Sequence, residues 1–254
     1  MNRLRRASVL LLVLASAAAA AGARADEVAC GAPPELLEPG VPLPATARAI
    51  SAGSLRVVVV GSASVLGAGT SGPAAAWPAR LEALLVARYA GLKVETVLRG
   101  APGLTAADSI AMVREELRRA PTQLVLWQTG AVEAARNLDL DELATTLDMG
   151  LARIGVAGAD AVLIDPQFSR FLRANANVEP YREAMRLAAA AHSAPLVRRY
   201  DLMHAWAEAE KVDLERAPRP AKVAVADRLN DCLAQAIAAL LIRGIEEAKA
   251  QPRP

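Results

Sequence analysis

The feature that most constrains this chain is an unbroken run of four valines, Val57 to Val60, that ends at Gly61. Valine is β-branched and favours extended strands, and a run with no polar residue leaves neither face of a strand suited to water. Such a run is typical of a strand that is buried on both faces of a parallel sheet. We therefore predict a strand over Leu55–Gly61 inside an α/β fold.

The rest of the chain alternates between strand and helix patterns. Apolar residues from Trp77 to Leu85 have helical spacing, and Thr105 with Asp108 resembles a capping box, which predicts the start of another helix. Further strands are expected at Leu92–Leu98, Leu124–Thr129, Ala161–Ile164 and Pro195–Tyr200, and further helices from Asp139, over Glu179–Ala191 and over Asp231–Lys249. This alternation predicts a three-layer α/β fold with about five parallel strands and helices on both faces.

The first 25 residues have the pattern of a secretory signal peptide. Arg3, Arg5 and Arg6 precede an apolar run, and Ala23-Arg24-Ala25 is a small-x-small cleavage site. We therefore expect an exported chain, periplasmic or secreted, in which residues 26–254 form one domain. Beyond the signal, no apolar run is long enough to span a bilayer, so we expect no stable membrane insertion after its removal.

Removal of that segment also changes the net charge. Residues 1–25 hold four of the 29 basic residues and none of the 27 acidic ones, which leaves the mature chain with a net charge of −2. With no basic stripe and few aromatic residues, the chain is not expected to bind nucleic acid. His192 and His204 are too far apart to begin a metal-ligand cluster, so we expect neither a metal nor a cofactor.

Two cysteines, Cys30 and Cys232, lie near opposite ends of the mature chain. In an exported chain an isolated pair favours a disulfide, which here would tie the leading segment to the last helix. Two buried thiols without a bond are the alternative.

Chemistry-bearing residues are expected directly after the strands, because the carboxyl ends of parallel strands meet at one edge of the sheet. The first strand leads into Gly61-Ser62-Ala63-Ser64-Val65-Leu66-Gly67. This segment resembles the nucleophile turn of SGNH/GDSL-type hydrolases. The resemblance implies ester-hydrolase ancestry and a flavodoxin-like doubly wound sheet in the order 2-1-3-4-5. It places Ala63, which has no nucleophilic atom, at the position of the catalytic serine.

Three further segments resemble the same family in the same order. Gly100 stands at the place of an oxyanion glycine, and Val132 stands at the place of an asparagine that donates to the oxyanion. Before the last helix, Asp227 matches the aspartate of an Asp-x-x-His motif, whereas Asn230 replaces its histidine base. The resemblance therefore implies a degenerate site, with vestigial positions Ala63, Gly100, Val132, Asp227 and Asn230.

Two kinds of function remain open. The first is a non-catalytic exported protein that uses the old cleft to bind a small-molecule, acyl-ester or glycan ligand of the cell envelope. The second is an active hydrolase of ester bonds with a rearranged site, in which Ser62 or Ser64 is the nucleophile. His204 or an acid such as Glu133 or Asp227 would then assist.

Other polar residues near the predicted strand ends have ordinary roles open to them. Gln128, Asp165 and Gln167 either make hydrogen bonds within loops or line the cleft, and Asp201 is expected to cap a turn. Asn230 is well placed to cap the helix expected from Asp231.

Overall fold

The valine run forms strand β1 (Ser54–Gly61) inside a five-stranded parallel sheet. The computed structural model describes residues 30–251, so the predicted signal peptide at 1–25 lies outside the described residues. The strand order β2-β1-β3-β4-β5 confirms the predicted doubly wound arrangement. The other strands are β2 (Lys93–Gly100), β3 (Leu124–Gln128), β4 (Asp160–Ile164) and β5 (Leu196–Val197).

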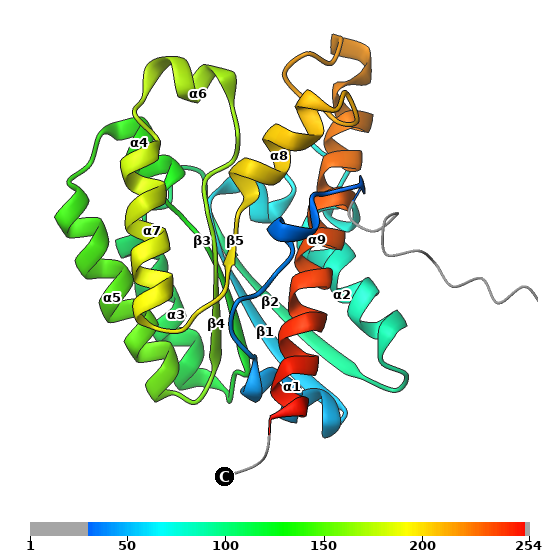
Figure 1. Cartoon of the computed structure of the whole chain (residues 1–254), viewed down its shortest axis with the longest axis vertical. Coiled ribbons are helices and arrows are strands. Elements are labelled where there is room, and N and C mark those ends of the chain that lie inside the picture. Colours follow the sequence, from blue (N-terminus) through cyan, green and yellow to red (C-terminus); the bar gives the residue numbers. More distant parts are fainter. Residues whose placement is uncertain (1–29, 252–254) are drawn as a thin grey trace, which may run out of the picture.

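Helices cover both faces of the sheet, as predicted (Figure 1). One face carries α3 (Ala106–Arg119), α5 (Leu140–Val156) and α7 (Glu179–Ala191). The other carries α1 (Pro44–Ser51), α2 (Trp77–Arg88), α8 (Arg199–Glu208) and α9 (Lys222–Ala250). Two short helices, α4 (Ala131–Arg136) and α6 (Arg170–Asn175), lie near the carboxyl ends of the strands.

The alternation of side chains along β1 explains why its whole run is apolar. Val57 and Val59 pack into the core shared with α1, α2 and α9, whereas Val58 and Val60 pack into the core shared with α3, α5 and α7. Burying a side chain of this size contributes about 1.5–3 kcal/mol relative to leaving it exposed. A polar residue at any of the four positions would therefore lie in one core or the other.

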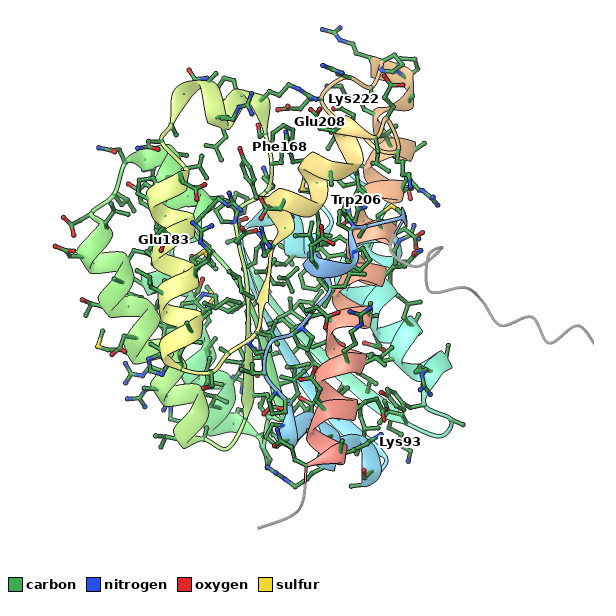
Figure 2. All side chains as sticks on the ribbon, viewed as in Figure 1. Lys93, Phe168, Glu183, Trp206, Glu208 and Lys222 are labelled. Atoms are coloured by element: carbon green, nitrogen blue, oxygen red, sulfur yellow. A yellow bond between two sulfur atoms is a disulfide. The ribbon has the colours of Figure 1, made fainter. Side chains whose placement is uncertain are left out.

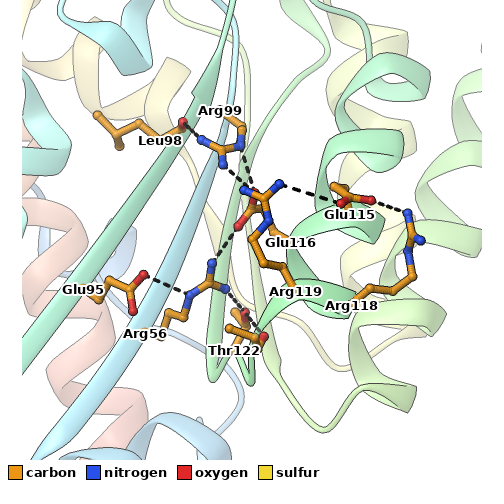
Figure 3. Close-up of polar contacts among 10 residues, drawn as sticks. Arg56, Glu95, Leu98, Arg99, Glu115, Glu116, Arg118, Arg119 and Thr122 are labelled. Atoms are coloured by element: carbon orange, nitrogen blue, oxygen red, sulfur yellow. Dashed lines mark hydrogen bonds and ion pairs between the residues drawn. The ribbon is translucent and has the colours of Figure 1, made fainter.

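A buried ion-pair cluster joins β1, β2 and α3 (Figure 3). The guanidinium of Arg56 donates from Nη2 to Glu116 Oε2 at 2.6 Å and from Nη1 to Thr122 Oγ1 at 2.6 Å. Arg99 donates from Nη2 to the other oxygen of the same carboxylate, Glu116 Oε1, at 2.5 Å. Burial raises the pKa of Glu116, but the hydrogen bonds from Arg56 and Arg99 together lower it by more. The pKa of Glu116 is therefore below the usual value.

Two elements have other bounds than predicted, one at its start and one at its end. Helix α9 begins at Lys222 instead of Asp231, because residues 222–230 contain neither glycine nor proline and continue the helix after the turn at Arg219–Ala221. Asn230 therefore lies inside α9 and does not cap it. Strand β5 ends at Val197 instead of Tyr200, because Arg199 already begins α8.

A disulfide joins Cys30 and Cys232, whose Cα atoms are 5.4 Å apart. Because Cys232 lies on α9, the bond ties the leading segment to the last helix, as expected. Within residues 30–251, no helix is long and apolar enough to cross a membrane.

Candidate functional site

A cavity of about 680 Å³ lies at the carboxyl ends of the strands. The chain leaving each strand contributes to its wall, because all five strands are parallel and end at the same edge of the sheet. Figure 2 shows Phe168, one of the wall residues, between α6 and α8, whereas Lys93 at the start of β2 lies at the opposite end of the molecule. The wall residues include Ser62, Ala63, Ser64, Val132, Gln167, Phe168, Arg199 and Asn230.

The turn after β1 presents two serines on either side of Ala63, and both are bonded to one amide. Gln128, the last residue of β3, donates from Nε2 to Ser62 Oγ at 3.1 Å. Ser64 donates its hydroxyl proton to Gln128 Oε1 at 2.9 Å. An amide oxygen takes no proton near neutral pH, so neither serine is bonded to a general base here.

Arg199, the first residue of α8, completes this polar group. Its side chain is buried, with the residue only 6% exposed. Nη1 donates to Ser64 Oγ at 3.3 Å and Nη2 donates to Gln167 Oε1 at 3.4 Å, while Nε has no acceptor. Burial lowers the pKa of Arg199 to about 10, so the guanidinium is still charged at neutral pH.

Of the five vestigial positions, the structure places Ala63, Val132 and Asn230 on the cavity wall. Gly100 and Asp227 do not line it. Gly100 pairs with Gly61 at the end of β2, where an added Cβ would lie 2.5 Å from Val65 Cγ2, so packing alone accounts for a glycine there. The carboxylate of Asp227 accepts the N–H of Ser71 at 2.8 Å on the exposed surface.

Asn230 uses its side chain to hold two helices together. Oδ1 accepts the N–H of Trp77, the first residue of α2, at 3.0 Å, and Nδ2 donates to the carbonyl of Ala226 at 2.9 Å. The asparagine thus caps α2 in space, instead of capping the helix that carries it. This role needs an acceptor that faces the α2 terminus, and it involves no proton transfer.

Glu133 is buried and does not line the cavity. Its carboxylate accepts the N–H of Ala106 at 2.5 Å, the N–H of Gly130 at 2.9 Å and the hydroxyl of Thr129 at 3.2 Å. These bonds cap the first turns of α3 and α4. Because the Gly130 N–H is already taken, it is not a free donor for an oxyanion.

The two histidines lie away from the serines. His204 stacks against the edge of Phe168, with ring centroids 4.8 Å apart, and its Nε2 is 3.6 Å from Glu208 Oε1. His192 contacts Asp148 Oδ1 through Nε2 at 2.7 Å. Neither imidazole lines the cavity beside Ser62 or Ser64.

The acids near the ends of β4 and β5 form a separate ion-pair network. Asp165 accepts from Arg182 Nε at 3.0 Å and from the N–H of Tyr200 at 2.8 Å. Burial raises the pKa of Asp165 to about 6, against the opposing effect of these two bonds. Asp201 accepts from Arg182 Nη2 at 2.8 Å and from Arg198, so neither of these two carboxylates is free to turn toward the cavity.

The sequence reasoning missed Arg199, although a signal for it was present. A basic residue two positions after the apolar pair Leu196-Val197 stands at a strand end, where site residues are expected. Extending the predicted strand to Tyr200 hid it. Within the described range of the chain, no group of three or more His, Cys, Asp or Glu residues is arranged to hold a metal ion.

Comparison with known proteins agrees with this fold. A family model described as the non-GDSL lipase-like family matches residues 29–247, whereas no curated protein matches the chain. Among solved structures, TesA is similar with a TM-score of 0.57 and 19% identity over 73% of this chain and 99% of its own.

Two further solved structures are similar at the same level. LAE5, an α/β hydrolase enzyme from the metagenome of Lake Arreo, Spain, has a TM-score of 0.54 and 21% identity over 70% of this chain and 96% of its own. A mutant of Axe2, an acetyl-xylooligosaccharide esterase from Geobacillus Stearmophilus, has a TM-score of 0.54 and 18% identity over 69% of this chain and 91% of its own. At such identities the likeness is one of fold.

Proposed function

We propose, from the premise that this chain belongs to the non-GDSL lipase-like family, that it is an exported member that binds a ligand in the cavity without hydrolysing it. The family and the fold confirm the resemblance to SGNH/GDSL-type hydrolases that the sequence indicated. Loss of catalysis, export and the ligand are our proposals.

The observation that carries this proposal is the hydrogen bonding of the cavity serines. A serine nucleophile is activated when its hydroxyl donates to a base that can keep the proton. Here the Ser64 hydroxyl donates to an amide oxygen and accepts from a guanidinium, and the Ser62 hydroxyl accepts from the same amide. Loss of an activated nucleophile costs a serine hydrolase on the order of 10⁶ in turnover.

Export is supported by the Cys30–Cys232 disulfide, since such bonds persist mainly in oxidising compartments. The sequence pattern at residues 1–25 is that of a signal peptide. Together they favour a protein that works in the periplasm or outside the cell.

A second candidate is an active ester hydrolase that uses Ser64, and one contact favours it. The Arg199 guanidinium, 3.3 Å from Ser64 Oγ, would stabilise a serine alkoxide by its charge. The expected helpers do not support it, because Glu133 is engaged by three donors in the core and His204 and Asp227 do not line the cavity.

The experiment that separates these functions is labelling with a fluorophosphonate probe, followed by peptide mapping. We expect no adduct on the purified exported protein while an active serine hydrolase is labelled in parallel. A stoichiometric adduct on Ser62 or Ser64 would overturn the proposal. Ser64→Ala and Ser62→Ala then serve as matched controls, because each should remove only its own adduct.

A restored site provides a positive control on the placement of the vestigial positions. Ala63→Ser with Asn230→His, and with Val132→Asn added, should raise esterase activity above that of the wild-type protein. Because Asn230 caps α2, Asn230→His is compared with Asn230→Ala to separate lost capping from gained chemistry. A folded triple variant without any gain would contradict the assigned positions.

A further inference from the structure

Three arginines are buried in the described part of the chain, and they differ in their partners. Arg56 contacts Glu116 at 2.6 Å, and Arg182 contacts Asp165 at 3.0 Å and two further acids at 2.8 Å. Arg199 is as deeply buried as Arg182, each residue being 6% exposed, yet within residues 30–251 no carboxylate oxygen lies within 4.0 Å of its guanidinium. Buried charges in proteins are normally paired, so an unpaired one calls for a partner from outside the chain.

The hydrogen bonds of Arg199 do not replace that partner. Two of its nitrogens make long bonds, 3.3 and 3.4 Å, to the uncharged oxygens of Ser64 and Gln167, and its third nitrogen has no acceptor. The guanidinium presents donors in a planar fork that matches the two oxygens of a carboxylate. Arg199 lines the cavity, and the Nε donor of its fork has no acceptor in the described part of the chain.

The acids that surround this region are already engaged by other groups. Both oxygens of Asp165 are taken, one by Arg182 and one by the N–H of Tyr200. Asp213 and Glu215 also belong to the cavity wall, but Arg170 lies within 4.0 Å of each. Among the described residues, Arg136, also on this wall, likewise has no carboxylate within 4.0 Å, but it is exposed to solvent. Arg199 is therefore the buried positive charge on this wall that has no charged partner in that part of the chain.

The remainder of the wall is largely apolar. It includes Val132, Phe168, Leu172, Met203, Leu214 and Leu229. A cavity of about 680 Å³ falls within the range of about 300–1,000 Å³ that holds small organic ligands. A glycan would need many polar partners along such a wall, whereas an acyl chain needs none.

We propose that the cavity binds a monocarboxylate with an apolar chain, its carboxylate on Arg199 and Ser64 and its chain along the apolar wall. This inference rests on the proposed binding function and names the class of ligand for it. At Arg199, one guanidinium and one hydroxyl match a single negative charge, whereas the second charge of a phosphate dianion would have no partner among the groups that contact Arg199.

The test is isothermal titration calorimetry on the purified exported protein, with octanoate, 1-octanol and octyl phosphate as probes. We expect octanoate to bind at least tenfold more tightly than 1-octanol, and each methylene removed from the chain to weaken binding about fourfold. Arg199→Met should weaken octanoate binding about 10- to 100-fold and leave 1-octanol binding unchanged. Arg198→Met is the matched control, because the neighbouring side chain carries the same charge, lies outside the cavity wall and should not affect octanoate binding.

Several results would overturn the inference. They are equal affinities for octanoate and 1-octanol, no loss of octanoate binding in Arg199→Met, or tighter binding of octyl phosphate than of octanoate. The comparison of the probes on the wild-type protein needs no variant, so it stands even where a variant fails to fold. Binding of 1-octanol alone would refute the carboxylate and keep the proposed binding function. Ser64-dependent release of 4-nitrophenol from its octanoate ester would instead refute the proposed function, and would make the carboxylate a product.

Discussion

Arg199 and Arg182 are equally buried, yet replacing each with methionine should change the free energy of unfolding in opposite directions. The fall in the pKa of Arg199 from its ordinary value to about 10 corresponds to a cost of about 3 kcal/mol for its charged form in the folded protein, at about 1.4 kcal/mol per pKa unit. Arg199→Met removes that cost. It also loses two hydrogen bonds, each worth less than about 1 kcal/mol because they are long and have neutral acceptors.

The expected net effect of Arg199→Met is therefore a gain of about 1–2 kcal/mol in the free energy of unfolding, or roughly 3–6 °C in Tm. Because burial lowers the folded-state pKa of this base, the cost is fully present below about pH 10 and disappears as the pH rises from there toward the ordinary pKa of arginine. At neutral pH the whole effect should be visible. A gain in stability coupled to a loss of binding is typical of a residue kept for function.

Arg182→Met should have the opposite effect, a loss of about 3–5 kcal/mol, because it leaves the buried carboxylate of Asp165 without its ion pair. The assay is urea unfolding at pH 7 in a buffer free of carboxylates, so that no buffer anion occupies the cavity. If Arg199→Met were destabilised as much as Arg182→Met, Arg199 would be a structural residue, and the reasoning from its missing partner would be refuted.

Three further predictions concern the framework around the cavity. Glu116→Gln should lower the free energy of unfolding by about 3 kcal/mol at pH 7, because it removes one partner of a buried ion pair. The folded-state pKa of Glu116 lies below its ordinary 4.5, so the stabilisation is present above pH 4.5 and is lost as the pH falls through the folded-state pKa. The urea midpoints of the wild-type protein and the variant should therefore converge in acid. Gly100→Ala should cost about 1–3 kcal/mol in the same assay, because the new methyl group overlaps Val65; a neutral result would show that the turn after β1 moves freely. Reduction of the Cys30–Cys232 bond should lower the unfolding free energy by up to about 5 kcal/mol, measured with and without dithiothreitol, and an unchanged midpoint would contradict this.

Periodicity in the sequence was enough to predict the parallel sheet and the helical layers on its two faces. The strand order was predicted from the family resemblance. The four valines of β1 divide between two cores because side chains alternate between the faces of a strand, and this alternation can be read from a short stretch of sequence. The ends of elements were harder to predict where neither glycine nor proline marks them. For that reason α9 begins nine residues earlier than expected, at Lys222 instead of Asp231.

The site was harder to predict because its main feature depends on contacts between distant segments. The resemblance located Ala63, Val132 and Asn230, which do share one cavity wall. That Asn230 caps α2 follows only from the packing of α2 on α9, which brings Asn230 to Trp77, 153 positions away in the sequence. That Arg199 lacks a carboxylate follows only from the way in which Arg182 occupies Asp165. The charges that surround a buried residue come from segments that are distant in sequence, so a short stretch of sequence does not reveal whether that residue is paired.

The disulfide can form only late in the synthesis of the chain. Its two cysteines are separated by 202 positions, and every strand of the sheet lies between them. The bond therefore cannot form until all five strands and the part of α9 up to Cys232 have been synthesised, however early the first cysteine is available. A chain interrupted anywhere before Cys232 keeps a free thiol at Cys30, so an accessible thiol at that position marks molecules that are unfinished or have not been oxidised.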